Sequence, residues 1–149
     1  MLRATFNSGQ SMNLNILANS IQASIEQKFL ILAVDPNEDN LMLIAYFLES
    51  FACQLITANN GEEALSLVKE YLPDLILLEI VLPDVNGLEV VAQLKQDKLT
   101  NQIPIIAVTG LARTEDRERI FQAGCDDYLG KPYMLNDLAN IISNYLKRI

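Results

Sequence analysis

Short apolar runs alternate with segments of helical periodicity five times between Phe29 and the end of the chain. The apolar runs predict strands at Phe29–Val34, Cys53–Thr57, Leu75–Ile80, Ile103–Thr109 and Asp126–Leu129. The segments of helical periodicity predict helices at Asn37–Ser50, Gly61–Tyr71, Gly87–Asp97, Thr114–Ala123 and Leu135–Lys147. Three runs are nearly continuous Val, Ile and Leu, as in parallel strands buried on both faces. The pattern therefore predicts an α/β fold: a doubly wound, five-stranded parallel sheet with five helices on both faces.

Residues that favour helix ends mark several of these boundaries. The segments Asn60–Glu63 and Thr114–Asp116 each offer a capping residue followed by acidic residues, which complement the dipole of a first helical turn. Gly124 follows the fourth predicted helix, where a C-terminal glycine is typical. These signals support the helix positions that the apolar periodicity predicts.

The first 28 residues differ from the rest of the chain. Residues 1–11 are polar and featureless, and we expect a mobile start. Leu14, Leu17, Ile21 and Ile25 then recur on one face of an amphipathic helix predicted over about residues 12–27. We therefore predict an N-terminal extension, residues 1–28, and a domain, residues 29–149. The helix either packs on its own domain or serves as a dimerisation or docking segment.

Composition excludes several classes of function. The chain of 149 residues is half apolar, which fits one domain with a sizeable core. A formal net charge of -8 argues against nucleic acid and anionic membranes as partners. Histidine is absent, which removes the commonest general base and phosphocarrier. Cys53 and Cys125 show no metal-binding spacing, and no apolar run approaches the ~18 residues of a membrane span. With no secretory signal in evidence, we expect a cytoplasmic protein.

Polar residues stand at the carboxyl ends of four predicted strands. Asp35 follows the first strand, Glu79 ends the third, Thr109 ends the fourth, and Lys131 lies just past the fifth. In an open α/β sheet these ends meet at one crevice. Carboxylates there can hold a divalent cation, while an ammonium and a hydroxyl can hold phosphoryl oxygens. The arrangement predicts a site for phosphoryl chemistry.

The motifs around these residues follow an order typical of one family. They are Ile31–Asp35 with Asn37–Asn40, Asn60–Leu65, Pro73–Leu78, Leu82-Pro83 with Asn86-Gly87, Ile103–Ile106 and Ala123–Pro132. From Phe29 to Ile149, about four-fifths of the chain, the sequence resembles the receiver domain of bacterial two-component response regulators. The resemblance implies a flavodoxin-like sheet with strand order 2-1-3-4-5.

The same resemblance implies a role for each site residue. Asp35 matches one of the acidic residues that organise Mg²⁺, and Glu79 stands at the position of the phospho-accepting aspartate. Thr109 matches the hydroxyl that moves to bind the phosphoryl group, and Lys131 the lysine that contacts acceptor or phosphate. Tyr128 matches the aromatic residue that turns inward on activation. Its alternative is a half-buried tyrosine with a solvated hydroxyl.

Two residues depart from the family pattern inside the site. Pro36 replaces the second acidic residue and offers no side-chain oxygen to Mg²⁺, which demands a near-octahedral oxygen set. Glu79 carries its carboxylate roughly 1.5 Å farther than an aspartate would, and a misplacement of about an ångström can cost ~10²-fold in rate. Glu38 or Asp39 could supply a substitute ligand, but acidic residues are common in a first helical turn for structural reasons.

The remaining charges suggest how such a site closes. Asp35 and Glu79 face Lys131 alone, which leaves one surplus negative charge. We therefore expect a Glu79–Lys131 ion pair that needs no metal, with Mg²⁺ bound weakly at most and no other cofactor. Glu79 either mimics the activated state in part, because a phosphoryl group would bring closer to two charges, or holds one fixed state.

These points predict a stand-alone receiver that is not phosphorylated, a pseudo-receiver, and that is not an enzyme. It would act on a protein partner, such as a histidine kinase, phosphorelay protein or output protein. The expected contact face combines the fourth helix, fifth strand and fifth helix, and a homodimer is also open. One alternative is an active receiver that accepts a phosphoryl group from a histidine kinase. Another is a flavodoxin-like small-ligand binder, although residues 35–39 lack the glycine of a phosphate loop.

Overall fold

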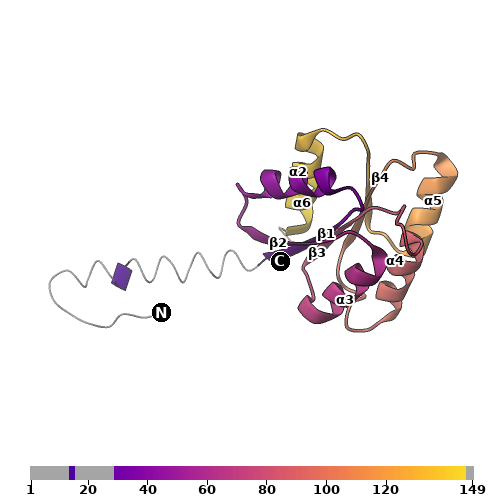
Figure 1. The fold of residues 1–149 in the computed structure, drawn as a ribbon, viewed down its shortest axis with the longest axis horizontal. Helices are drawn as coiled ribbons and strands as arrows, with labels where there is room; N and C mark the ends of the chain where they lie inside the picture. Colours follow the sequence, from indigo (N-terminus) through magenta and orange to yellow (C-terminus); the bar gives the residue numbers. More distant parts are fainter. Residues whose placement is uncertain (1–13, 16–28, 147–149) are drawn as a thin grey trace.

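The computed structural model describes residues 14–15 and 29–146 (Figure 1). Its elements are β1 (Phe29–Val34), α2 (Glu38–Leu48), β2 (Cys53–Ala58), α3 (Gly61–Tyr71), β3 (Leu75–Leu78), α4 (Gly87–Gln96), β4 (Ile105–Thr109), α5 (Thr114–Ala123), β5 (Asp127–Gly130) and α6 (Leu135–Leu146). Leu14 and Asn15 are helical, and the rest of the helix predicted over about residues 12–27 lies outside the described residues. No helix in the described ranges is long and apolar enough to cross a membrane.

The five strands form one parallel sheet in the order β2-β1-β3-β4-β5. The predicted fold class and strand order are therefore confirmed. β1 lies between β2 and β3, so that Leu32 pairs with Ile56 on one side and with Ile76 on the other. β3 and β4 are buried along their whole length, as their continuous apolar sequences indicate.

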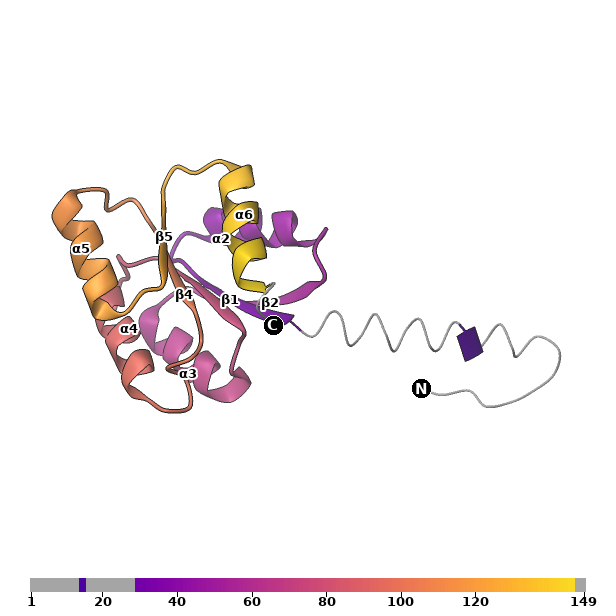
Figure 2. The same ribbon diagram turned by 180° about the vertical axis from the view of Figure 1, so that it is seen from behind.

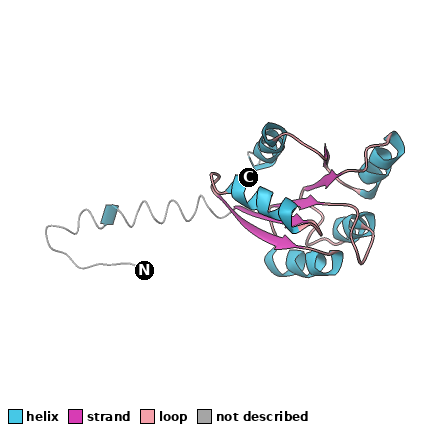
Figure 3. Cartoon of the chain, turned by 45° about the horizontal axis from the view of Figure 1, so that its top comes forward, coloured by secondary structure: helices cyan, strands magenta, loops and turns pink. Residues whose placement is uncertain are grey.

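Helices cover both faces of the sheet (Figures 1, 2 and 3). Helices α3, α4 and α5 pack on one face, where Val68, Val91 and Ile120 join a core with alternate strand residues. Helices α2 and α6 pack on the other face, where Ile44 and Ile142 join the remaining strand residues. Because side chains alternate along a strand, each central strand contributes to both cores, and the sheet edge that carries the polar residues is held from both sides.

Several predicted boundaries require correction. The third strand ends at Leu78 instead of Ile80, because the Ile80 N–H donates to the Glu79 carboxylate and not to a neighbouring strand. The fourth strand begins at Ile105 instead of Ile103, because Pro104 has no N–H to donate to a ladder. The fifth strand is shifted by one residue, to Asp127–Gly130.

The helix ends show two confirmed caps and one wrong one. The Asn60 side chain accepts from the Glu63 N–H at 2.8 Å, and Gly124 ends α5 with φ of 120°. Thr114, which was expected to cap α5, is instead its first helical residue, and Arg113 occupies the N-cap position. The Asp116 carboxylate accepts from the Arg113 N–H at 3.3 Å, so a residue inside the helix satisfies the exposed donor. The first predicted helix begins at Glu38 and ends at Leu48, and the third ends at Gln96.

Candidate functional site

The backbone fixes the three charged residues of the site at one edge of the sheet. Asp35, Glu79 and Lys131 each lie one residue beyond a strand, and each donates its N–H to the last residue of a neighbouring strand. The bonds measure 3.0 Å from Asp35 to Ala58 O, 2.9 Å from Glu79 to Val34 O and 2.9 Å from Lys131 to Thr109 O. The sheet ladder thus extends far enough to hold these backbones before their side chains interact.

Lys131 joins the two carboxylates. Its Nζ lies 2.5 Å from Asp35 Oδ2 and 2.9 Å from Glu79 Oε1. The Asp35 and Glu79 side chains are 7% and 10% exposed, whereas that of Lys131 is 22% exposed. Burial alone would lower the pKa of Lys131, but hydrogen bonds to the two carboxylates and their negative charges raise it above the ordinary lysine value. Lys131 therefore remains an ammonium that bridges two acids.

The second oxygen of Glu79 is held by the backbone that follows it. Oε2 accepts from the Ile80 N–H at 2.7 Å and from the Val81 N–H at 3.1 Å. The extra methylene of glutamate gives the side chain the length to turn back onto its own loop. These two N–H groups are donors that an anion at this position would otherwise use, and the carboxylate of Glu79 occupies them.

Asp35 is also satisfied from within the chain. Its Oδ1 accepts from the Asn37 N–H at 2.9 Å, and its Oδ2 accepts from Asn40 Nδ2 at 3.1 Å as well as from Lys131. Asn37 in turn caps α2, since its side chain accepts from the Asp39 N–H at 2.8 Å. All four carboxylate oxygens of Asp35 and Glu79 therefore accept at least one hydrogen bond from the protein.

The residues present do not fit Mg²⁺. Pro36 is exposed and brings no side-chain oxygen, and the oxygens of the two acids already face donors. Glu38 and Asp39 lie exposed in the first turn of α2. Among the described residues, no group of three or more His, Cys, Asp or Glu side chains is placed to hold a metal ion. Since Mg²⁺ requires several oxygen ligands in octahedral geometry, the site as folded has no complete ligand set.

Thr109 lies at the same edge but outside the charged cluster. It is fully buried, and its hydroxyl oxygen accepts from the Leu111 N–H at 3.3 Å. Within the described part of the chain, no hydrogen bond joins this hydroxyl to Glu79 or Lys131. The structure thus brings Asp35, Glu79 and Lys131 together but leaves Thr109 bonded to its own loop.

Tyr128 is half-buried on β5, and its hydroxyl is not left to solvent. The hydroxyl donates to the Leu111 carbonyl oxygen at 2.7 Å, and the guanidinium of Arg117 lies 4.7 Å from the ring centroid. The backbone of Leu111 therefore bonds both residues: its carbonyl oxygen accepts from the Tyr128 hydroxyl, and its N–H donates to the Thr109 hydroxyl oxygen. The loop between β4 and α5 therefore links the two residues expected to act as switches.

The loop after Glu79 is anchored at a second point, which no motif in the sequence indicates. The Asp84 carboxylate accepts from the Gly61 N–H at 2.8 Å and the Glu62 N–H at 2.9 Å, at the start of α3. These backbone hydrogen bonds, first from Gly61 and then from Glu62, hold the pKa of Asp84 below its usual value. Gly87 closes the loop, because a Cβ there would lie 2.6 Å from backbone atoms of Ile80.

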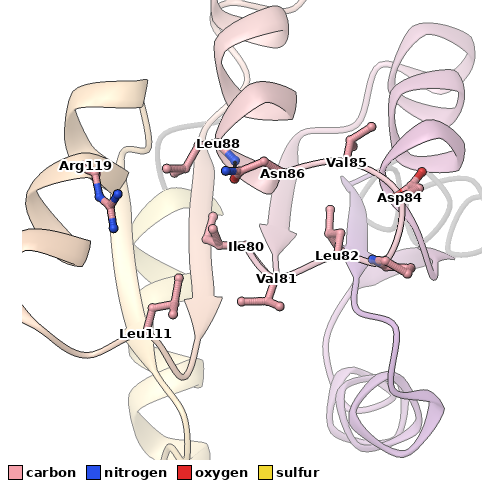
Figure 4. A pocket seen from close by; sticks show the side chains of 10 residues that line it. Ile80, Val81, Leu82, Asp84, Val85, Asn86, Leu88, Leu111 and Arg119 are labelled. Atoms are coloured by element: carbon pink, nitrogen blue, oxygen red, sulfur yellow. Dashed lines mark hydrogen bonds between the residues drawn. The ribbon is translucent and has the colours of Figure 1, made fainter.

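A pocket of about 420 Å³ lies beside this loop, between the loop and α5 (Figure 4). Its walls are mainly apolar and include Ile80, Leu82, Leu88 and Leu111. In Figure 4, Arg119 projects from α5 toward the gap that Ile80, Leu88 and Leu111 frame. Ile80 belongs both to this wall and to the donor pair that holds Glu79, so the pocket adjoins the charged cluster.

The fold and the site edge define a doubly wound α/β domain with a charged cluster at the carboxyl ends of its strands, and comparison with known proteins shows the family. The model of the family described as "Response regulator receiver domain" matches residues 31–143. The chain belongs to this family, whose members are signalling domains of two-component systems that act through other proteins and are not classical enzymes.

Individual relatives agree with this assignment. The chain is 43% identical over 116 residues to the polar-differentiation response regulator DivK of Brucella anthropi, a match that covers 78% of this chain and 94% of that protein. A two-component response regulator from Clostridium difficile superposes with a TM-score of 0.76 at 30% identity, covering 81% and 98%. The receiver domain of sensor histidine kinase PA1611 from Pseudomonas aeruginosa, with magnesium ion coordinated in its active site cleft, gives 0.74 at 29% identity, covering 80% and 98%.

Proposed function

We propose that this receiver domain is a pseudo-receiver: a stand-alone signalling module that is not phosphorylated and that acts by binding other proteins. The DivK relative supports the stand-alone part, because the match spans 94% of that protein and leaves little room for an output domain there. In two-component signalling, such a module presents a surface without taking part in phosphoryl transfer, and it is not an enzyme.

One observation carries the proposal. Both carboxylate oxygens of Glu79 accept hydrogen bonds from the protein, one from Lys131 and the other from the N–H groups of Ile80 and Val81. A carboxylate that attacks phosphorus needs a free oxygen, and the incoming phosphoryl oxygens need donors and a cation. Here the carboxylate itself takes the donors, and Pro36 supplies no side-chain oxygen to a cation. Phosphorylation would have to break these contacts first.

The hydrogen bonds also favour a fixed scaffold over a mimic of the activated state. Glu79 engages Lys131, but the Thr109 hydroxyl is bonded to Leu111 instead. The Tyr128 hydroxyl donates to the Leu111 carbonyl, and the Arg117 guanidinium lies over the Tyr128 ring. A single carboxylate charge supports one lysine contact without drawing the hydroxyl inward, so we propose one constitutive arrangement of α5 and β5.

The partner surface that we propose is the α5–β5–α6 face. Phe121 is 44% exposed on α5, beside Arg117, and an exposed aromatic next to an arginine is a common anchor in protein interfaces. A protein partner or a second copy of the chain could use this anchor. Sedimentation equilibrium of wild type and Phe121→Ser separates the two cases. A dimer that Phe121→Ser abolishes would support self-association, and an unchanged monomer would leave only a different protein.

The proposal is tested by intact mass after incubation with acetyl phosphate and Mg²⁺. We expect no phosphoryl adduct on the wild-type chain and an adduct on the Pro36→Asp/Glu79→Asp double variant, which regains a metal ligand and the shorter acceptor. The single variants Pro36→Asp and Glu79→Asp show which change matters more. A wild-type adduct that maps to Glu79 would overturn the proposal and make the protein an active receiver.

A further inference from the structure

The pocket between the Glu79 loop and α5 combines an apolar floor with donors at its rim. Ile80, Leu82, Leu88 and Leu111 supply apolar walls around about 420 Å³. This volume lies within the range of small-molecule sites, roughly 300–1,000 Å³. The wall residues come from β3's following loop, from α4 and from the loop before α5, so three elements already packed together shape the pocket.

One end of the pocket carries a guanidinium, that of Arg119. Arg119 lines the pocket, and its Nη2 donates to Asp116 Oδ1 at 3.1 Å. Asp116 also receives Arg113, so two guanidinium groups share this one buried carboxylate. Glu115 lies 3.7 Å from Arg113 and is not among the residues that line the pocket. Among the described residues, no other group takes the remaining donors of Arg119.

Asn86 adds a second donor. Its side-chain oxygen accepts from the Leu88 N–H at 2.9 Å, which leaves its amide nitrogen without a partner within the described chain. Asp84 is the one acid in the lining, and both its oxygens are taken by the N–H groups of Gly61 and Glu62. Figure 4 shows Asp84 at the opposite end of the pocket from Arg119. Away from the Asp84 end, the lining side-chain groups that have no partner in the described chain are donors, those of Arg119 and Asn86.

We propose that this pocket binds a small apolar carboxylic acid, with the apolar group against Ile80, Leu88 and Leu111 and the carboxylate on Arg119. Apolar walls with a few convergent donors fit such an amphiphilic anion, and a guanidinium matches a carboxylate in geometry and charge. The site is distinct from phosphoryl chemistry, because none of these groups is Asp35, Glu79 or Lys131.

The position of the pocket gives such a ligand a route to the signalling surface. Ile80 donates its N–H to Glu79, and the Leu111 carbonyl accepts the Tyr128 hydroxyl. A ligand packed on Ile80 and Leu111 would therefore contact one residue that is bonded to the charged cluster and one that is bonded to Tyr128. Ligand occupancy would take the place that phosphorylation has in an active receiver.

The test is an NMR titration of the ¹⁵N-labelled full chain with phenylacetate as probe. We expect saturable shifts of the Leu88, Leu111 and Arg119 amides. Phenylacetamide lacks the charge and acetate lacks the apolar group, and we expect neither to reproduce these shifts. Arg119→Gln should weaken phenylacetate binding about tenfold, the effect of one charge-assisted contact. Arg113→Gln is the matched control, since Arg113 also pairs with Asp116 but does not line the pocket, and it should bind like wild type.

Three results would overturn the inference: no saturable shift at millimolar phenylacetate, equal shifts with phenylacetamide, or equal weakening by Arg113→Gln and Arg119→Gln. The amide spectrum of each variant reports whether it is folded. This titration and the mass test can fail separately, because they probe different residues. Absence of phenylacetate binding would say nothing about whether Glu79 is phosphorylated. A phosphoryl adduct on Glu79 would likewise leave the pocket residues unchanged.

Discussion

Replacing Lys131 with methionine tests how the charged cluster is held together. The change keeps much of the apolar stem but removes the ammonium that bridges Asp35 and Glu79 at 2.5 and 2.9 Å. Removing one partner of a buried ion pair costs about 3–5 kcal/mol. Lys131 is 22% exposed, and the two acids keep their backbone and amide donors, so we expect the lower end of that range, about 3 kcal/mol.

Urea unfolding measures this loss as a lower midpoint with an unchanged slope. Lys69→Met is the control, because Lys69 is exposed and makes no ion pair among the described residues, and we expect a change within about 0.5 kcal/mol. The double variant Lys131→Met/Glu79→Gln should regain part of the loss, since it leaves one buried charge instead of two. A loss below about 1 kcal/mol in Lys131→Met, typical of an exposed pair, would refute the buried-bridge reasoning.

Three further predictions follow from the same contacts. Because the pKa of Lys131 is raised in the folded protein, the contribution of Lys131 to the free energy of unfolding is complete below the ordinary lysine pKa of 10.5 and is lost as pH rises through the folded-state pKa. The difference in urea midpoint between wild type and Lys131→Met should therefore persist at neutral pH and close at high pH. Gly87→Ala should cost about 1–3 kcal/mol in urea unfolding, because its Cβ would meet the Ile80 backbone, whereas Gly110→Ala, with open space around its Cβ, should stay within about 0.5 kcal/mol; equal effects would contradict this contrast. Burial raises the pKa of Cys125 to about 12 and also raises that of Cys53, so at pH 8 a thiol reagent should modify neither in the folded protein and both in urea; rapid native labelling of Cys125 would be contradictory.

The sequence predicted the sheet well because its central strands are nearly continuous apolar runs, as expected for parallel strands that are buried on both faces. Residues placed by strand ends, such as Asp35, Glu79 and Lys131, could be located for the same reason, since parallel strands end at one edge. The identity of Pro36 and Glu79 also showed where the site departs from the family, without coordinates.

Contacts that depend on side-chain conformation could not be predicted. Nothing in the sequence shows that Glu79 turns back onto the Ile80 N–H, because the backbone turn that presents this N–H forms after β3 has ended. Asp84 caps α3 from a loop more than twenty residues away in sequence, so no local motif marks it. Thr114 matched a local capping pattern, but Asp116 satisfied the Arg113 N–H instead.

The most direct test of the central claim, that Glu79 and Lys131 close the site without metal or phosphoryl group, is the ¹⁵N amide spectrum with Mg²⁺ and beryllofluoride, which replaces a phosphoryl group on a carboxylate. For the wild-type chain we predict no saturable shift at Ile80, Val81 or Thr109, while the Pro36→Asp/Glu79→Asp variant shifts at all three. Saturable wild-type shifts at these amides would show that the site still accepts the ligands of an active receiver, and would contradict the account.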